Sequence, residues 1–208
     1  MTTIFDIAPP VRAGIAVYPG DTPYKAARTG VISDDCPLNV GELSMSCHCG
    51  AQAGSPLHHD KDGASIDQLD LADFVGPARV SDAQGPEEKC SLKDLEGFPT
   101  DGSPRILPRL AGAIDPVVLP EGFRAMSTDA ISFLADQDVE LVGVDVPTAD
   151  RENSEKLPIH EIARSRDLQI LENLALSAVE PGYYELIALP MELEGLDAAP
   201  VRAILRPF

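Results

Sequence analysis

The stretch Cys47-His48-Cys49-Gly50-Ala51-Gln52-Ala53-Gly54-Ser55-Pro56-Leu57-His58-His59 contains three of the four histidines of this 208-residue chain. The fourth, His160, precedes Glu172 in a second segment far downstream. Imidazole is both a common metal ligand and an acid–base group near neutral pH. Because the chain is poor in histidine, this clustering indicates one site. Gly and Pro interrupt regular structure, so we expect the stretch to be largely an irregular loop.

Composition sets broad limits on fold and partners. The chain is 44% hydrophobic, enough to bury a core, and its length suits a single α/β domain over residues 1–208. The formal net charge of −18 argues against nucleic acid and anionic membranes, which need basic patches. No apolar run approaches the ~18 residues of a membrane span, and the N-terminal residues lack a basic, apolar signal. We therefore expect a cytoplasmic protein whose cysteines are free thiols.

Periodicity predicts several elements around the histidines. Alternation over Glu42–His48 predicts a strand that ends with His48 on its polar face. Asp129–Gln137 is predicted to be a helix capped by Ser127 or Thr128, and Pro158–Ser165 a helix with His160 in its first turn. Further strands are predicted at Pro77–Val80, Val139–Asp145, Leu168–Leu171 (running into Glu172), Tyr184–Leu189 and Val201–Leu205. The sequence thus predicts a mixed α/β fold with many short strands.

The segment from His48 to His58 resembles the signature of the kynurenine formamidase and cyclase family, His-x-Gly-Thr/Ala-His-x-Asp-x-Pro-x-His. The resemblance extends over nearly the whole chain. Other segments that fit the family, in order, are Tyr18-Pro19-Gly20-Asp21, Asp62-Gly63, Phe74–Val80, Gly143–Asp145, Pro158–His160, Ile170–Glu172 and Ala199–Ala203.

The resemblance implies a swivelling β/β/α fold, a homodimer, and a two-zinc site that hydrolyses N-formyl-L-kynurenine or a related amide or lactone. By position, it places His48, Gln52, Gly54, His160 and Glu172 at the metal-ligand positions. It also places His58 at the catalytic histidine, and Tyr18 at a tryptophan that contacts substrate.

Two of these positions depart from the family pattern. Gln52 replaces a histidine, and an amide is a poor zinc ligand. Gly54 replaces an aspartate that bridges both metals, and it offers no ligand. With Glu172 as the one remaining carboxylate, repulsion between two close dications would be poorly offset. The sequence therefore predicts fewer than two metals per chain.

Two reduced sites remain open at this point. One Zn or Mn ion could bind His160, Glu172 and either His48 or His58, with a cysteine thiolate (Cys47 or Cys49) as a less favoured ligand. Alternatively, no metal binds, and His58 and Glu172 act as acid and base.

The predicted function is that of a kynurenine formamidase-like hydrolase or cyclase acting on a small aryl amide, lactone or carbonyl compound. The alternative is a dimer that binds a small ligand without turnover, in which the histidines are relics held by loop hydrogen bonds. The retention of His48, His58, His160 and Glu172 favours an enzyme.

Overall fold

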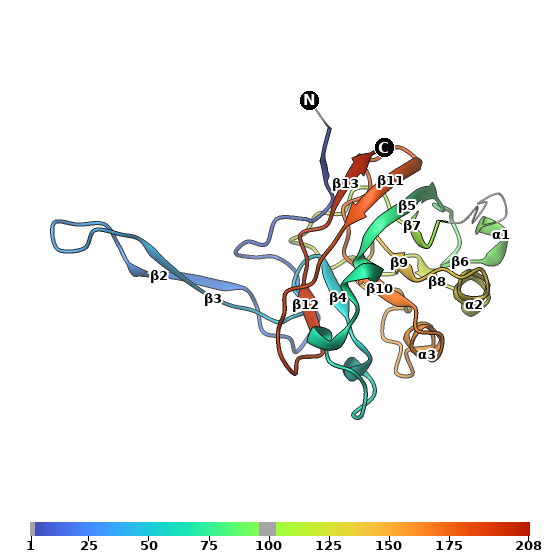
Figure 1. The fold of residues 1–208 in the computed structure, drawn as a ribbon, viewed down its shortest axis with the longest axis horizontal. Coiled ribbons are helices and arrows are strands. Elements are labelled where there is room, and N and C mark those ends of the chain that lie inside the picture. Colours follow the sequence, from blue (N-terminus) through green and yellow to red (C-terminus); the bar gives the residue numbers. More distant parts are fainter. Residues whose placement is uncertain (1–2, 96–102) are drawn as a thin grey trace.

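A nine-stranded mixed sheet organises the fold in our computed structural model, which describes residues 3–95 and 103–208. The strand order is β1-β13-β11-β5-β7-β9-β10-β4-β12, and the sheet curls while helices cover one side (Figure 1). The predicted mixed α/β architecture with many short strands is confirmed. The strands are β1 (Phe5–Asp6), β2 (Lys25–Gly30), β3 (Val40–Ser44), β4 (Gln52–Gly54), β5 (Val75–Asp82), β6 (Lys89–Cys90), β7 (Arg105–Arg109), β8 (Ala125–Met126), β9 (Leu141–Gly143), β10 (Gln169–Glu172), β11 (Gly182–Ile187), β12 (Ala198–Pro200) and β13 (Ile204–Pro207). The helices are α1 (Leu92–Leu95), α2 (Thr128–Asp136) and α3 (Pro158–Ser165), with 3-10 turns at Pro56–His58, Ile66–Gln68 and Leu71–Phe74.

The middle of the sheet is parallel and its flanks are antiparallel. Strands β5, β7, β9 and β10 pair in parallel, whereas β4 pairs antiparallel with both β10 and β12. Central parallel strands are buried on both faces and therefore read as apolar runs. This is why Leu141–Gly143 and Gln169–Glu172 could be recognised as strands from the sequence.

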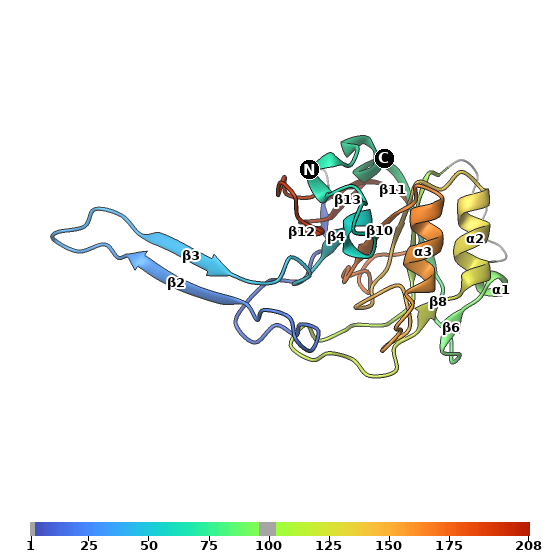
Figure 2. The ribbon, with the colours of Figure 1, turned by 90° about the horizontal axis from the view of Figure 1, so that it is seen from below.

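Successive residues of the central strands enter two different cores. Leu107, Leu141 and Leu171 belong to the core inside the curl of the sheet. Their neighbours Ile106, Val142 and Ile170 belong to the core beneath α2 and α3, which lie side by side in Figure 2. Alternate side chains of a strand point to opposite faces, so each short strand contributes to both layers.

The two predicted helices are confirmed nearly to the residue. Helix α2 begins after Ser127, whose hydroxyl accepts a hydrogen bond from the Ala130 backbone N–H. Helix α3 begins with Pro158, a residue suited to the first helical turn because its missing N–H has no intrahelical partner there. It buries Ile159 and His160, so its first turn carries His160 into the interior.

The predicted strand over Glu42–His48 is wrong beyond Ser44. Strand β3 ends there, and His48 lies in a turn in which the Cys49 N–H donates to the Ser46 carbonyl. The alternation of Leu43 with polar neighbours also creates no buried face, since Leu43 is 62% exposed. The reason is that β2 and β3 pair only with each other.

Strands β2 and β3 form an arm that projects from the body (Figures 1 and 2). Large apolar side chains are exposed along it and at its tip, namely Val31, Ile32, Leu38, Val40 and Leu43.

Among all the described residues, no helix has the length and apolar character needed to cross a membrane.

Candidate active site

Strand β4 brings the histidine-rich stretch into the sheet. It lies between β10 and β12, with Gln52 opposite Glu172 and Gly54 opposite Ala198. The turn before β4 carries His48, and the 3-10 turn after it ends at His58. Strands β10 and β12 and the two turns that flank β4 therefore meet around this three-residue strand.

A cavity of about 340 Å³ lies at this convergence. Six of the seven predicted site residues line it, namely Tyr18, His48, Gln52, His58, His160 and Glu172. Gly54 instead lines an adjoining pocket that shares His58 and His160 with the first. The structure thus brings the predicted residues together, and five of them belong to two hydrogen-bonded groups.

The first group centres on Glu172, a buried carboxylate at the end of β10. The His160 Nε2 lies 3.3 Å from Glu172 Oε1, which also accepts a hydrogen bond from the Ala149 N–H. The other imidazole nitrogen, His160 Nδ1, lies 2.7 Å from Asp150 Oδ2. Asp150 additionally accepts the N–H groups of Ile159 and His160 at the start of α3. His160 is thereby held between two carboxylates.

Electrostatics make this group an ion pair. Burial opposes charge on Glu172, but its contacts with His160 outweigh burial and lower the pKa of the carboxyl to about 2. Burial likewise opposes charge on His160, but hydrogen bonds to Asp150 and Glu172 raise its pKa to about 10. A protonated imidazole therefore sits against Glu172 when no other cation is there.

Gln52 closes the remaining side of Glu172. Its Nε2 donates a hydrogen bond of 2.9 Å to Glu172 Oε2. An ionised carboxylate only accepts, so the amide nitrogen must face it and the amide oxygen must point elsewhere. That oxygen, Gln52 Oε1, is buried and has no hydrogen-bond partner among the described residues. Gln52 thus satisfies Glu172 and leaves an acceptor of its own unpaired.

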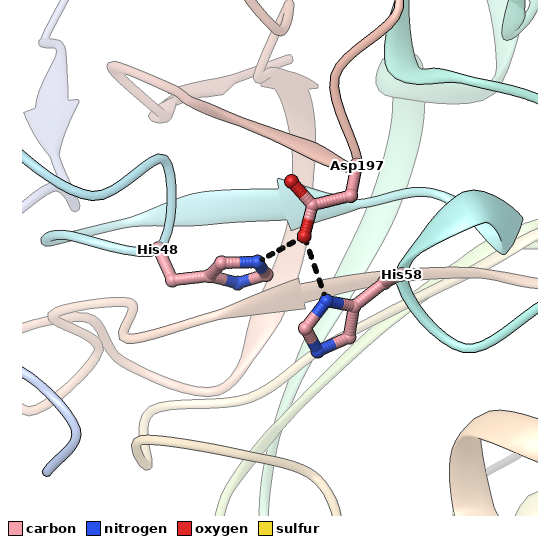
Figure 3. A group of neighbouring side chains, drawn as sticks. All are labelled: His48, His58 and Asp197. Atoms are coloured by element: carbon pink, nitrogen blue, oxygen red, sulfur yellow. Dashed lines mark hydrogen bonds and ion pairs between the residues drawn. The ribbon is translucent and has the colours of Figure 1, made fainter. Parts of the chain in front are cut away.

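The second group joins His48 and His58 through Asp197. Asp197 Oδ2 lies 2.9 Å from His48 Nε2 and 2.8 Å from His58 Nδ1. Figure 3 shows both rings turned toward this one oxygen. Partial burial opposes charge on Asp197, but the two histidine hydrogen bonds prevail and lower its pKa. This group is half-buried and more accessible than the Glu172 group.

Space for a side chain is available at Gly54. A Cβ built there has no heavy atom within 4 Å, and Gly54 is not among the residues with positive φ. The backbone conformation and the space for a Cβ therefore both permit a side chain at this position.

We expect the double variant Gln52→His with Gly54→Asp to bind zinc more tightly than the wild type. The change replaces the amide that occupies Glu172 with an imidazole and adds a carboxylate in open space. Zinc titration of both proteins at one pH measures the effect. Equal affinity in a folded variant would show that positions 52 and 54 do not face the cation.

The structure also indicates the protonation of the tyrosine and the cysteines near the site. Tyr18 lines the cavity, and burial together with nearby carboxylates raises its pKa to about 12, so it presents a neutral hydroxyl. Cys47 and Cys49 are free thiols that do not line the cavity, and burial raises the pKa of each. A thiolate ligand from either cysteine is not supported.

Sequence reasoning missed Asp197 and Asp150. Asp197 directly precedes Ala198–Pro200, a small and apolar strand, and its position at the start of that strand was the available signal. Asp150 offered no comparable signal, because it lies in a polar loop. His59 is also more enclosed than a loop surface suggests, since both of its ring nitrogens are buried and lack partners in the described part of the chain.

The donor atoms fit one cation better than two. His48, His58 and Asp197 each offer one ligand atom, and these atoms lie within 4.8 Å of one another. Asp197 Oδ2 is hydrogen-bonded to both of these histidines, whereas the buried carboxylate of the Glu172 group holds the Gln52 amide and the Ala149 N–H as well as His160. A carboxylate at position 54, which would join the two groups, is absent.

Comparisons with known proteins identify the family of the chain. The profile of the cyclase family matches residues 5–151. Proteins named kynurenine formamidase from Bordetella pertussis and Delftia acidovorans are each 40% identical to the chain, over 99% of both chains in the first case and over 98% of this chain and 97% of the relative in the second. A solved structure described as a potential metal-dependent hydrolase with cyclase activity superposes with a TM-score of 0.85 at 27% identity, covering 99% of this chain and 98% of the other. The chain therefore belongs to the cyclase family, among relatives named as kynurenine formamidases and metal-dependent hydrolases.

Proposed function

We propose that the protein is a kynurenine formamidase-like hydrolase or cyclase that acts on a small aryl amide, lactone or carbonyl compound through a reduced site. The observation that carries this proposal is that His58 and His160 line one cavity and that each is paired with a carboxylate, Asp197 and Glu172 respectively. An imidazole oriented by a carboxylate can act as an acid–base group, which suits His58, whereas His160 stays protonated between Glu172 and Asp150. The family relationship supports hydrolysis as the reaction class.

His58 is the acid–base residue of the proposal. When no cation is bound, its Nδ1 faces Asp197, which orients the ring and leaves Nε2 available for proton transfer. Glu172 is the second ionisable group in the cavity, and its charge is held by His160 and the Ala149 N–H. A cation held on His58 Nδ1 would keep the ring proton on Nε2, and the cation would then supply Lewis acidity and ease deprotonation of water in place of the His58 base.

The cavity suits a small substrate with an aromatic part. Its volume of about 340 Å³ falls at the small end of ligand pockets. Pro147 and Leu157 give it apolar walls, and the neutral Tyr18 hydroxyl can donate to a carbonyl oxygen. A compact aryl carbonyl compound matches this mixture of surfaces.

We expect N-formyl-L-kynurenine itself to be hydrolysed slowly, below the ordinary enzymatic range of ~1–1000 per second. Amide cleavage needs a strong nucleophile, and the substitutions at Gln52 and Gly54 remove ligands for the metal pair that would generate one. The assay follows kynurenine release by absorbance, beside a panel of aryl lactones and other aryl carbonyl compounds. Fast formamidase turnover would refute the reduced site, and no turnover across the panel would refute the enzyme.

A non-catalytic protein that binds small ligands is the second candidate. It is favoured by the closed Glu172 group, in which all hydrogen-bonding atoms of the carboxylate and the imidazole are already engaged. Calorimetric binding of a panel compound without product formation would support it over the enzyme.

We further propose a cytoplasmic homodimer, and we assign the dimer contact to the projecting arm. The cytoplasmic assignment is supported by the four free cysteines of the described residues. The arm exposes apolar residues such as Ile32 and Leu43, which are 61% and 62% exposed in the single chain. A mass of two chains by light scattering, reduced to one by Ile32→Asp with Leu43→Asp, supports this assignment.

A further inference from the structure

We propose that a single divalent cation binds at His48, His58 and Asp197, and that the Glu172 group does not hold it. The donors are His48 Nε2, His58 Nδ1 and Asp197 Oδ2. This set differs from the family ligand positions, because Asp197 lies outside the motif and His58 occupies the catalytic position.

The spacing of the donors is close to that of a bound site. Zinc bonds of 2.0–2.2 Å in a tetrahedral arrangement place ligand atoms about 3.3 Å apart. In the protein, Asp197 Oδ2 is 2.9 Å from His48 Nε2 and 2.8 Å from His58 Nδ1. These two pairs would each need to lengthen by about half an ångström to reach that spacing, and all three donor atoms lie within 4.8 Å of one another. Asp197 Oδ2 now holds both histidine rings near the position where a cation would bind all three donor atoms.

The backbone preorganises two of the three donors, those of Asp197 and His58. Asp197 immediately precedes β12, which pairs with β4 so that Ala198 lies opposite Gly54. The Ser55 N–H and hydroxyl both donate to the Asp197 carbonyl, at 2.9 Å and 3.0 Å. His58 follows Ser55 within the same turn, and its N–H donates to the Ser55 carbonyl. The sheet edge and this turn therefore set the separation of Asp197 from His58.

The donor chemistry selects a class of cation. Two imidazole nitrogens and one carboxylate oxygen suit borderline ions such as Zn²⁺ and Co²⁺, whereas Mg²⁺ and Ca²⁺ prefer all-oxygen shells. Three protein ligands leave a position open, as in catalytic zinc sites. Gln52 lines the same cavity, and its Oε1 is a buried acceptor that has no hydrogen-bond partner among the described residues.

The competing position at Glu172 is already filled by protein donors. Binding there would require the cation to break the Gln52–Glu172 hydrogen bond and to separate His160 from Glu172. At Asp197 the cation replaces two histidine hydrogen bonds to one partly exposed carboxylate. The cation therefore displaces fewer buried interactions at the Asp197 group.

Cobalt titration followed by visible absorption tests the assignment without substrate. We expect the wild type to bind one Co²⁺ per chain, with the intense bands of a low-coordinate nitrogen and oxygen site, and added Zn²⁺ to displace it. Asp197→Asn and His48→Gln should each weaken binding by at least about 10-fold, which is the low end of the loss caused by removing even an outer-shell partner. Glu172→Gln and His160→Gln should leave the affinity and the spectrum unchanged.

The pattern of variants decides between the two positions. Loss of binding in a folded Glu172→Gln or His160→Gln protein, with Asp197→Asn unaffected, would overturn the proposal. So would a wild type that binds neither ion. Since Glu172→Gln perturbs a buried ion pair, circular dichroism checks its fold, and His160→Gln provides a second variant of that group.

The proposal names the cation site of the proposed enzyme, but its test is independent of turnover. Binding is read from the Co²⁺ spectrum, while the proposed function is read from product formation across the substrate panel. One cation without turnover would leave this inference standing and remove the enzyme. Turnover in protein that binds no cation would leave the proposed enzyme standing and remove this inference.

Discussion

Replacing Glu172 with alanine is expected to lower the free energy of unfolding by about 3–5 kcal/mol, the cost of breaking a buried ion pair by removing one partner. Glu172 accepts from His160, Gln52 and the Ala149 N–H inside the protein. Without it, a buried protonated His160 keeps only Asp150 as a counter-charge, and two further donors lose their acceptor. Urea unfolding monitored by circular dichroism measures the change.

A matched control lies on helix α3. Glu161 also forms an ion pair, with Arg164, but at the exposed surface of the helix. Glu161→Ala should leave the unfolding midpoint nearly unchanged, because exposed pairs are screened by solvent. If the two alanine variants unfolded at the same denaturant concentration, the Glu172 group would not be the buried ion pair described above.

The second large effect is on the rate. We expect His58→Asn to lower turnover of whichever panel compound is converted by ~10²–10⁴-fold, the usual contribution of a positioned acid–base group. His58 lines the cavity and is oriented by Asp197, so the asparagine retains polarity but cannot transfer a proton. Steady-state kinetics on folded protein gives the ratio.

The neighbouring histidine provides the comparison. His59 adjoins His58 in the chain but lines the adjoining pocket and not the cavity. His59→Asn should therefore change the rate far less than His58→Asn. Equal losses in the two variants would mean that the pocket has been disturbed as a whole and that His58 has no special role.

Local signals predicted much of the fold. Helix α3 and strand β10 were recognised because a proline start and an apolar run are each readable from a few neighbouring residues. Strand β3 was extended too far, since alternation alone cannot show that a segment lacks a second layer to pack against. The extent and exposure of β3 depend on what the strand packs against, and a local sequence pattern does not contain that information.

The candidate site was predicted in its residues but not in its connections. The motif placed His48, His58, His160 and Glu172 at one cavity, as the structure shows. Asp197 was missed because it reaches His58 from 139 positions away, through pairing of β12 with β4. Long-range strand pairing leaves little trace in a single sequence. The hydrogen bond from Gln52 to Glu172 was hidden for the same reason.

The reduced site is tested most directly by the number of cations bound per chain. Native mass spectrometry of the folded protein, loaded with excess zinc and then desalted, counts them. The arrangement of His48, His58 and Asp197 beside a closed Glu172 group predicts one zinc per chain. Two zinc ions per chain, with the second lost in Glu172→Gln, would contradict it.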